Sequence, residues 1–112
     1  MTPGDVVLTQ LIQEDGQEKL RPALVLKIMP PFGDYLVCGI SSKLRNFVPT
    51  LDEIIYEEDS DFSQSGLNHT SLIRVGWLFT APLLSIEGEL GKIDDKRLQR
   101  LLERLSRFLT DH

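Results

Sequence analysis

The stretch with the clearest chemical potential is Arg21-Pro22, which precedes a mainly apolar run from Ala23 to Ile28. Proline lacks a backbone N–H and fits best at the first position of a strand. A short run of branched apolar residues is typical of a strand buried on both faces. We therefore expect Arg21 to lie where a loop passes into a rigid strand, and a guanidinium held there suits a phosphate group. The alternative is an arginine that only begins a strand.

Other reactive residue types are scarce. The chain has one cysteine, Cys38, and two histidines, His69 and His112. Cys38 stands in an apolar run, so we expect a buried, inert thiol, and no Cys/His spacing predicts a zinc site. His69 stands in a turn, where a neutral imidazole would suit general-base chemistry. A solvated loop histidine is nevertheless the expectation for this position.

The composition predicts one ordinary globular domain spanning 1–112. The hydrophobic fraction is 41% and the charged fraction 26%, and a chain of this size can build a core without metal or disulfides. No apolar run has the length of a membrane span, and the N-terminus lacks a signal-peptide pattern. We therefore expect a cytoplasmic protein that has no contact with a membrane.

The charge balance limits the functions that involve nucleic acid. The net charge is −5, whereas nucleic-acid binders usually carry a basic footprint. Acidic residues gather in the middle of the chain, and arginines gather near the C-terminus. Any RNA site would therefore be a local positive patch on a negative molecule.

The elements that must position these residues are several short strands and one helix. Turn signals separate expected strands at 5–12, 21–28, 35–40, 51–56, 70–75 and 83–93, with the segment 76–80 after the fifth of them. The acidic, serine-rich segment 57–65 is expected to be a solvated loop. After Asp94-Asp95, leucines at helical spacing predict a helix that packs on the sheet, with its arginines expected mainly on a solvated face. The sum is a mainly β protein: a strongly bent antiparallel sheet or partly open barrel with a C-terminal helix.

An ordered set of short motifs gives the chain a resemblance to a known family. The motifs are Pro3-Gly4-Asp5-Val6-Val7, Arg21-Pro22-Ala23-Leu24-Val25-Leu26, Ile40-Ser41-Ser42-Lys43, Gly66-Leu67, Ser71-Leu72-Ile73-Arg74 and Leu90-Gly91-Lys92-Ile93. In this order they resemble the MazF/PemK (Kid-like) toxins of type II toxin–antitoxin systems, nearly end to end. The resemblance implies an SH3-like small barrel of the MazF/PemK/CcdB type, a homodimer and a cognate antitoxin. It also implies cleavage of single-stranded RNA without metal or cofactor.

The resemblance also implies roles for individual residues. Arg21 matches the family's arginine before proline and is assigned phosphate clamping and transition-state stabilisation. Ser41 stands where many relatives carry a catalytic threonine, and Arg74 matches an arginine that acts as an acid or as an anchor for RNA. These three form the predicted catalytic set. The predicted substrate-binding residues are Lys19, Ser42 and Lys43.

Some positions remain open after this assignment. Ser41 and Ser42 have an alternative role as hydroxyls that only cap a strand end. Some relatives carry an Asp two residues after the arginine, where this chain has Gly76, so the resemblance leaves the proton acceptor unassigned. Trp77 could stack on a base, but we expect it to pack in the core or in a dimer interface.

Two other functions compete with the ribonuclease. The same fold could serve a toxin that binds a protein target such as DNA gyrase without catalysis, or a regulatory module that has lost catalysis. The Arg-Pro motif and Ser41 favour the nuclease, whereas Gly76 and the acidic balance weigh against it. The structural question that separates them is whether Arg21, Ser41 and Arg74 meet in one groove.

Overall fold

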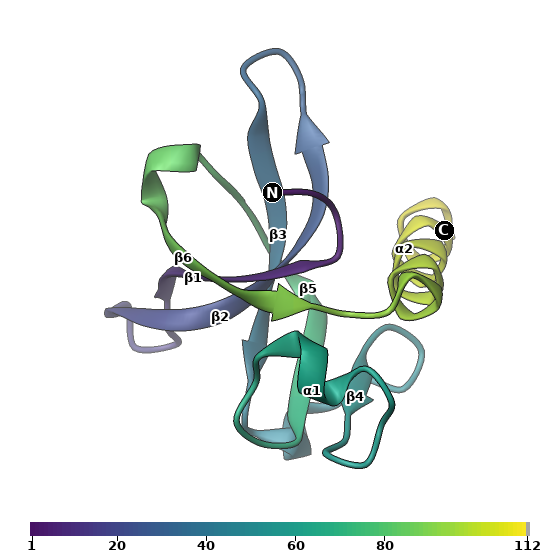
Figure 1. Ribbon diagram of the computed structural model, residues 1–112. Helices are drawn as coiled ribbons and strands as arrows, with labels where there is room; N and C mark the ends of the chain where they lie inside the picture. Colours follow the sequence, from purple (N-terminus) through teal and green to yellow (C-terminus); the bar gives the residue numbers. More distant parts are fainter. Residues whose placement is uncertain (112) are drawn as a thin grey trace.

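The computed structural model describes residues 1–111 and shows one antiparallel sheet with a helix across it (Figure 1). The sheet has six strands in the order β4-β5-β3-β2-β1-β6. The strands are β1 (Asp5–Ile12), β2 (Glu18–Met29), β3 (Asp34–Ser41), β4 (Glu53–Ile55), β5 (Ser71–Ala81) and β6 (Ile86–Lys92). The helices are α1 (Phe62–Ser65) and α2 (Asp95–Thr110), with 3₁₀ turns η1 (Leu44–Asn46) and η2 (Leu83–Ser85). The predicted mainly β fold with a C-terminal helix is confirmed.

The sheet is strongly bent, but its strands do not close into a barrel. β4 and β6 are its outer strands, and no ladder joins them in the part of the chain that the structure describes. Helix α1, which lies beside β4 in Figure 1, packs against β6. A Cβ at Gly91 of β6 would overlap the backbone of Gln64 and Ser65, so glycine permits this close approach. The implied barrel is therefore an open sheet whose two ends are linked by α1.

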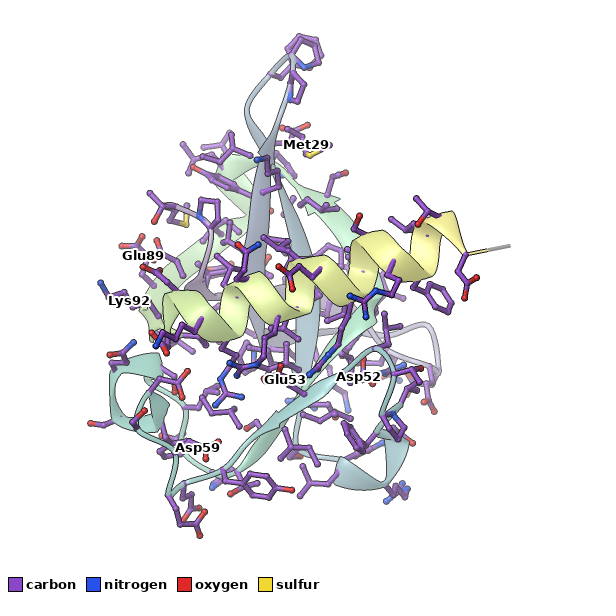
Figure 2. All side chains as sticks on the ribbon, turned by 90° about the vertical axis from the view of Figure 1, so that its right-hand side faces the viewer. Met29, Asp52, Glu53, Asp59, Glu89 and Lys92 are labelled. Atoms are coloured by element: carbon purple, nitrogen blue, oxygen red, sulfur yellow. The ribbon has the colours of Figure 1, made fainter. Side chains whose placement is uncertain are left out.

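The segment 57–65 was expected to be a solvated loop, and this expectation is wrong for Asp61 and Ser65, which are buried, and for Phe62–Ser65, which form α1. Asp61 is only 4% exposed, and Arg97 of α2, which was expected on a solvated face, is 7% exposed. Arg97 donates to Asp61 at 2.8 Å, to Glu53 at 2.9 Å and to Asp59 at 3.1 Å. We call these four residues the Arg97 cluster. Figure 2 shows Glu53 beneath α2, so the cluster joins the helix to β4 and to the segment before α1.

The Arg97 cluster is charged in the folded protein. The hydrogen bonds from Arg97 hold the pKa of Asp61 below its ordinary value, although burial acts in the opposite direction. Burial alone would lower the pKa of Arg97, but the hydrogen bond and charge of Asp61, with the charge of Glu53, raise it overall. Arg100 and Arg104 also contact Glu53, at 2.9 and 3.1 Å. Three arginines of α2 are therefore bound to carboxylates of the same molecule.

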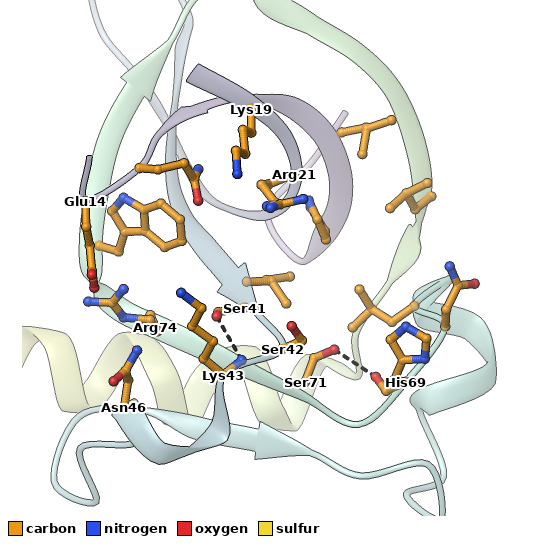
Figure 3. Close-up of a pocket in the computed structure, with 18 of the residues that line it drawn as sticks. Glu14, Lys19, Arg21, Ser41, Ser42, Lys43, Asn46, His69, Ser71 and Arg74 are labelled. Atoms are coloured by element: carbon orange, nitrogen blue, oxygen red, sulfur yellow. Dashed lines mark hydrogen bonds between the residues drawn. The ribbon is translucent and has the colours of Figure 1, made fainter. Parts of the chain in front are cut away.

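Strand β2 begins earlier than expected, so Pro22 lies inside it and not at its first position. Pro22 is paired with Leu8 of β1, but the ladder between β2 and β3 begins only at the pair Ala23 and Gly39. Pro22 therefore stands where β2 loses one of its two neighbours, a place that tolerates a residue without an N–H. β3 continues along β5 as far as Ser41. The two strands thus separate, and Arg21 and Ser41 face the space between them (Figure 3).

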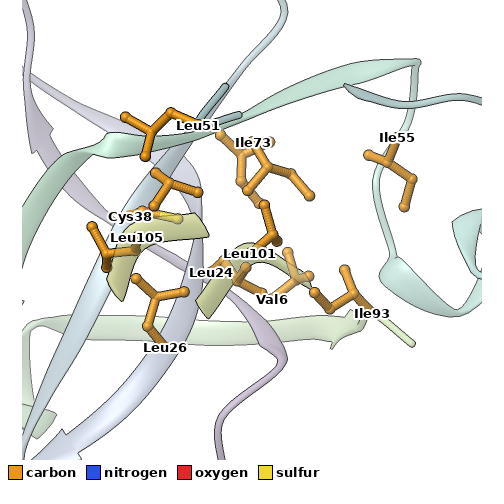
Figure 4. Close-up of a cluster of buried hydrophobic side chains, with 12 residues drawn as sticks. Val6, Leu24, Leu26, Cys38, Leu51, Ile55, Ile73, Ile93, Leu101 and Leu105 are labelled. Atoms are coloured by element: carbon orange, nitrogen blue, oxygen red, sulfur yellow. The ribbon is translucent and has the colours of Figure 1, made fainter. Parts of the chain in front are cut away.

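The core lies on both faces of the central strands. In β2, Leu24 and Leu26 belong to the cluster that packs under Leu101 of α2 (Figure 4). Ala23 and Val25 belong to a second cluster on the opposite face. All five side chains are fully buried, and each buried leucine contributes about 1.5–3 kcal/mol to stability. This confirms the expected burial on both faces for residues 23–26, whereas Lys27 and Ile28 are exposed, and it makes β2 a rigid support for Arg21.

One finding concerns the helices alone. Within residues 1–111, no helix is both long enough and apolar enough to cross a membrane.

Candidate active site

A cavity of about 960 Å³ opens where β2 and β3 separate (Figure 3). Its walls come from β2, from the end of β3 with the loop after it, from the β1–β2 loop, from the turn 66–69 and from β5. This volume is at the upper end of the range for sites that bind small ligands. The cavity is large enough to hold one nucleotide and part of the nucleotides on either side of it.

All six residues predicted for the site line this one cavity. They are Lys19, Arg21, Ser41, Ser42, Lys43 and Arg74. Arg21 comes from β2, Ser41 from the end of β3 and Arg74 from β5. The Ser41 hydroxyl oxygen accepts the backbone N–H of Lys43 at 3.0 Å, so its own proton is free to be donated to a ligand. The structure thus brings the predicted groups together, while their roles stay predictions.

The charges around the cavity differ from those of the rest of the molecule. Four cations line it, Lys19, Arg21, Lys43 and Arg74, against two carboxylates, Glu14 and Asp15. Among residues 1–111, none of these four cations forms an ion pair, whereas three arginines of α2 do. The cavity is therefore a local positive region in a chain of net charge −5, and its cations are available to a phosphate.

A bulge in β5 positions Arg74. The β3–β5 ladder passes directly from the pair Cys38 and Leu78 to the pair Gly39 and Arg74. Residues 75–77 of β5 therefore have no pairing residue in β3. Trp77 lies against Gly39, where a Cβ would overlap its ring. The guanidinium carbon of Arg74 is 5.1 Å from the centroid of the same ring, a cation–π contact. Gly39 thus makes room for Trp77, and Trp77 holds Arg74 beside the cavity.

Trp77 was expected in the core or in a dimer interface, but it lies half-buried in the cavity wall. The sequence contained one signal for this position, since Gly76 inside an apolar strand is typical of a bulge. One face of the indole contacts β3 and the ring also carries the Arg74 guanidinium. Trp77 is therefore better placed to position Arg74 than to stack on a base.

Four residues of the cavity wall were not in the predicted site, although His69 had been considered as a general base. Asn46, Asn68, His69 and Ser71 line the cavity. The Ser71 hydroxyl donates to the backbone carbonyl of His69 at 2.7 Å. His69 is exposed as expected for a turn, but it faces the same space as the predicted catalytic set. The other histidine, His112, lies outside the described residues.

The remaining reactive group lies away from the cavity. Cys38 is fully buried, and burial raises the pKa of its thiol to about 12, with a smaller contribution from the charge of Asp52. This confirms the expected inert thiol. Within the described part of the chain, no group of three or more His, Cys, Asp or Glu side chains could hold a metal ion.

Comparisons with known proteins agree with this arrangement of strands. The family model described as PemK-like, MazF-like toxin of type II toxin–antitoxin system matches residues 2–109. Among solved structures, the Mycobacterium tuberculosis toxin MazF-mt6 is similar over 96% of this chain and 99% of that chain, with a TM-score of 0.69 and 20% sequence identity. At that identity the likeness shows the fold. A comparison with curated proteins gave no match.

Proposed function

The chain belongs to the family of PemK-like, MazF-like toxins of type II toxin–antitoxin systems, and on this premise we propose that it is a metal-independent endoribonuclease acting on single-stranded RNA. Membership of a type II toxin–antitoxin family implies an antitoxin as its partner. The observation that carries the enzymatic part of the proposal is the cavity. Within residues 1–111, four cations that form no ion pair line this cavity together with two serine hydroxyls.

The proposed reaction uses the substrate's own 2′-OH as the nucleophile. The 2′-oxygen attacks the adjacent phosphorus and the bond from phosphorus to the 5′-oxygen breaks, which leaves a 2′,3′-cyclic phosphate and a free 5′-OH. The site must stabilise the extra negative charge on the phosphate, accept one proton and donate another. Hydrogen-bond donors fixed by the fold do the first task without reorganising during the reaction.

The cavity supplies donors for that charge. Arg21 can offer two parallel N–H groups to one phosphate, and its strand is fixed by the core on both faces. Ser41 adds a hydroxyl whose proton is free to donate. Arg74, held by Trp77, anchors the RNA at the far end of the cavity. Lys19, Ser42 and Lys43 bind the neighbouring part of the RNA chain.

Cleavage of a long, unstructured RNA in EDTA tests the proposal. The wild type should cut and leave 2′,3′-cyclic phosphate ends. Arg21→Ala should lose about 10²- to 10³-fold in rate, the usual effect of removing one transition-state donor. Arg107→Ala is the matched control, because Arg107 is exposed on the last turn of α2 and does not line the cavity. Growth inhibition by a wild-type protein that cuts no RNA would contradict the proposal and favour a toxin with a protein target.

We also propose that the protein is a homodimer that acts in the cytoplasm, where its proposed substrate is found. Some large apolar side chains are almost fully exposed in the single chain, such as Leu84 at 98% and Phe32 at 87%. Exposed apolar groups of this size are suited to an interface. Light scattering on the purified protein tests the dimer, and a mass of one chain at micromolar concentration contradicts it.

A further inference from the structure

The cavity contains few groups that could accept a proton from a 2′-OH. Guanidinium groups hardly ever lose their proton, which excludes Arg21 and Arg74, and a serine hydroxyl is not basic enough. One oxygen of the Asp15 carboxylate accepts the backbone N–H of Gln17 at 3.0 Å, within its own loop. Glu14, Asp15 and His69 are the remaining candidates among the described lining residues, and Glu14 and His69 lie at opposite ends of the cavity (Figure 3).

The backbone of His69 is fixed although its ring is exposed. On its C-terminal side, the buried Ser71 begins β5 and its hydroxyl binds the His69 carbonyl. On its N-terminal side, the turn begins at Gly66, which lies against the backbone of Leu90 in β6. Among residues 1–111, no hydrogen bond involves either ring nitrogen of His69. The imidazole is thus held at the cavity wall with both nitrogens available.

The arrangement around the proposed phosphate site suits an in-line displacement. Figure 3 shows His69 on one side of the cavity and Lys43 and Arg74 on the other, with Arg21 and Ser42 between them. In-line attack requires the entering and leaving oxygens to lie on opposite sides of the phosphorus. With His69 as proton acceptor and Lys43 as proton donor, the two proton transfers would take place on different sides of the cavity.

We propose that His69 is a catalytic residue, the general base that accepts the proton of the 2′-OH. This inference rests on the proposed ribonuclease function. As the bond from the 2′-oxygen to phosphorus forms, the proton passes to a ring nitrogen of His69. As the bond to the 5′-oxygen breaks, that oxygen keeps the electron pair and takes a proton from the Lys43 ammonium. One proton is thus accepted and one donated, and His69 and Lys43 return to their starting states by exchange with solvent.

The charged groups around His69 come from every wall of the cavity. Lys19 and Arg21 come from β2, Lys43 from the loop after β3 and Arg74 from β5; Glu14 and Asp15 lie across the cavity on the β1–β2 loop. A general base accepts a proton only in its unprotonated form. The cleavage rate of the wild type should therefore rise with pH.

Single-turnover cleavage of a fluorescent RNA in EDTA, from pH 5 to 9, tests the role of His69. At pH 7.5, His69→Gln should lower the rate constant by about 10²- to 10⁴-fold, the usual contribution of a general base. The rise with pH should disappear in the variant, and added imidazole should partly restore His69→Ala. Binding of 2′-O-methyl RNA, which cannot be cut, should remain within about threefold of wild type, because the base contributes mainly in the transition state.

The outcomes separate this inference from the function on which it rests. Cleavage by His69→Gln at the wild-type rate and with the wild-type pH profile overturns the role of His69 and leaves the ribonuclease intact. Loss of the pH-dependent rise in Glu14→Gln, with His69→Gln unchanged, transfers the role to Glu14. A wild type that cuts no RNA overturns both proposals. His69 is exposed, so its variants should keep the wild-type melting temperature, which excludes misfolding as the cause of a loss.

Discussion

The unpaired cations of the cavity predict how RNA affinity depends on salt. A protein that neutralises phosphates of a single strand releases counterions, and log K falls with log salt by about 0.7 for each phosphate. If Lys19, Arg21, Lys43 and Arg74 each meet one phosphate, the slope is about −2.8. The affinity should then fall by about 50-fold between 50 and 200 mM KCl. A negative molecule would thus bind RNA with the salt dependence of a small basic site.

Single substitutions distinguish the effect of the cations in the cavity from that of the other cations of the molecule. Lys19→Ala removes one phosphate contact, so the slope should fall to about −2.1. Arg107→Ala and Arg100→Ala remove the same formal charge, but Arg107 lies away from the cavity and Arg100 is bound to Glu53 at 2.9 Å. Neither control should change the slope. Fluorescence anisotropy with labelled 2′-O-methyl RNA measures these slopes without cleavage.

One result would refute this reasoning directly. If Arg107→Ala lowered the slope as much as Lys19→Ala does, the RNA would be responding to the overall charge of the molecule. The cavity would then have no special part in binding. An unchanged slope in Lys19→Ala, with cleavage intact, would show only that this lysine meets no phosphate.

Three further predictions concern the supports of the site. Arg97→Ala leaves the buried Asp61 carboxylate without its cation, whereas Glu53 keeps Arg100 and Arg104. The free energy of unfolding should fall by about 3–5 kcal/mol in urea titrations. The deficit should narrow below about pH 4, because the lowered pKa of Asp61 makes its contribution present above that pH and lost as the pH falls. A deficit constant to pH 3 contradicts this. Gly39→Ala should displace Trp77, the single tryptophan, and lower the free energy of unfolding by about 1–3 kcal/mol. An unchanged tryptophan emission spectrum would contradict the contact between Gly39 and Trp77. Cys38, with its pKa raised to about 12, should resist a thiol reagent at pH 8 until urea unfolds the chain; rapid labelling of the native protein contradicts its burial.

The elements with strong local signals were predictable from the sequence. β1 occupies 5–12 as expected, and α2 begins at Asp95 after Asp94, although the Asp94 side chain makes no capping hydrogen bond. The start of β2 was missed because Glu18, Lys19 and Leu20 are exposed and show no apolar pattern. Their strand conformation comes from pairing with β1, and a pairing partner is not a property of the local sequence.

The Arg97 cluster could not be predicted for a similar reason. The spacing of leucines identified the apolar face of α2, but it does not show which arginine of the other face meets a carboxylate. Arg97 is 36 residues from Asp61 and 44 from Glu53. A dense acidic segment and an arginine-rich helix in one small domain are the signals that could have suggested such a pairing.

The members of the candidate site were predictable, but the shape of the site was not. Arg21, Ser41 and Arg74 followed from motifs, and their meeting in one cavity depends on the point where β2 and β3 separate, which is a matter of register. His69 belongs to no motif. Its place on the wall follows from the path of the chain between α1 and β5.

The Arg97 cluster gives α2 a mechanical connection to a cavity that none of its own residues touches. Asp61 is hydrogen-bonded to the helix, and the nine residues after it, 62–70, form α1, the Gly66 turn and the cavity wall at His69 before β5 begins. Loss of the contacts between α2 and Asp61 should therefore loosen this wall although nothing in the cavity itself has changed. Faster hydrogen exchange at residues 62–70 in Arg97→Ala, with unchanged exchange rates in β2 and β3, would show that α2 stabilises this wall through Asp61.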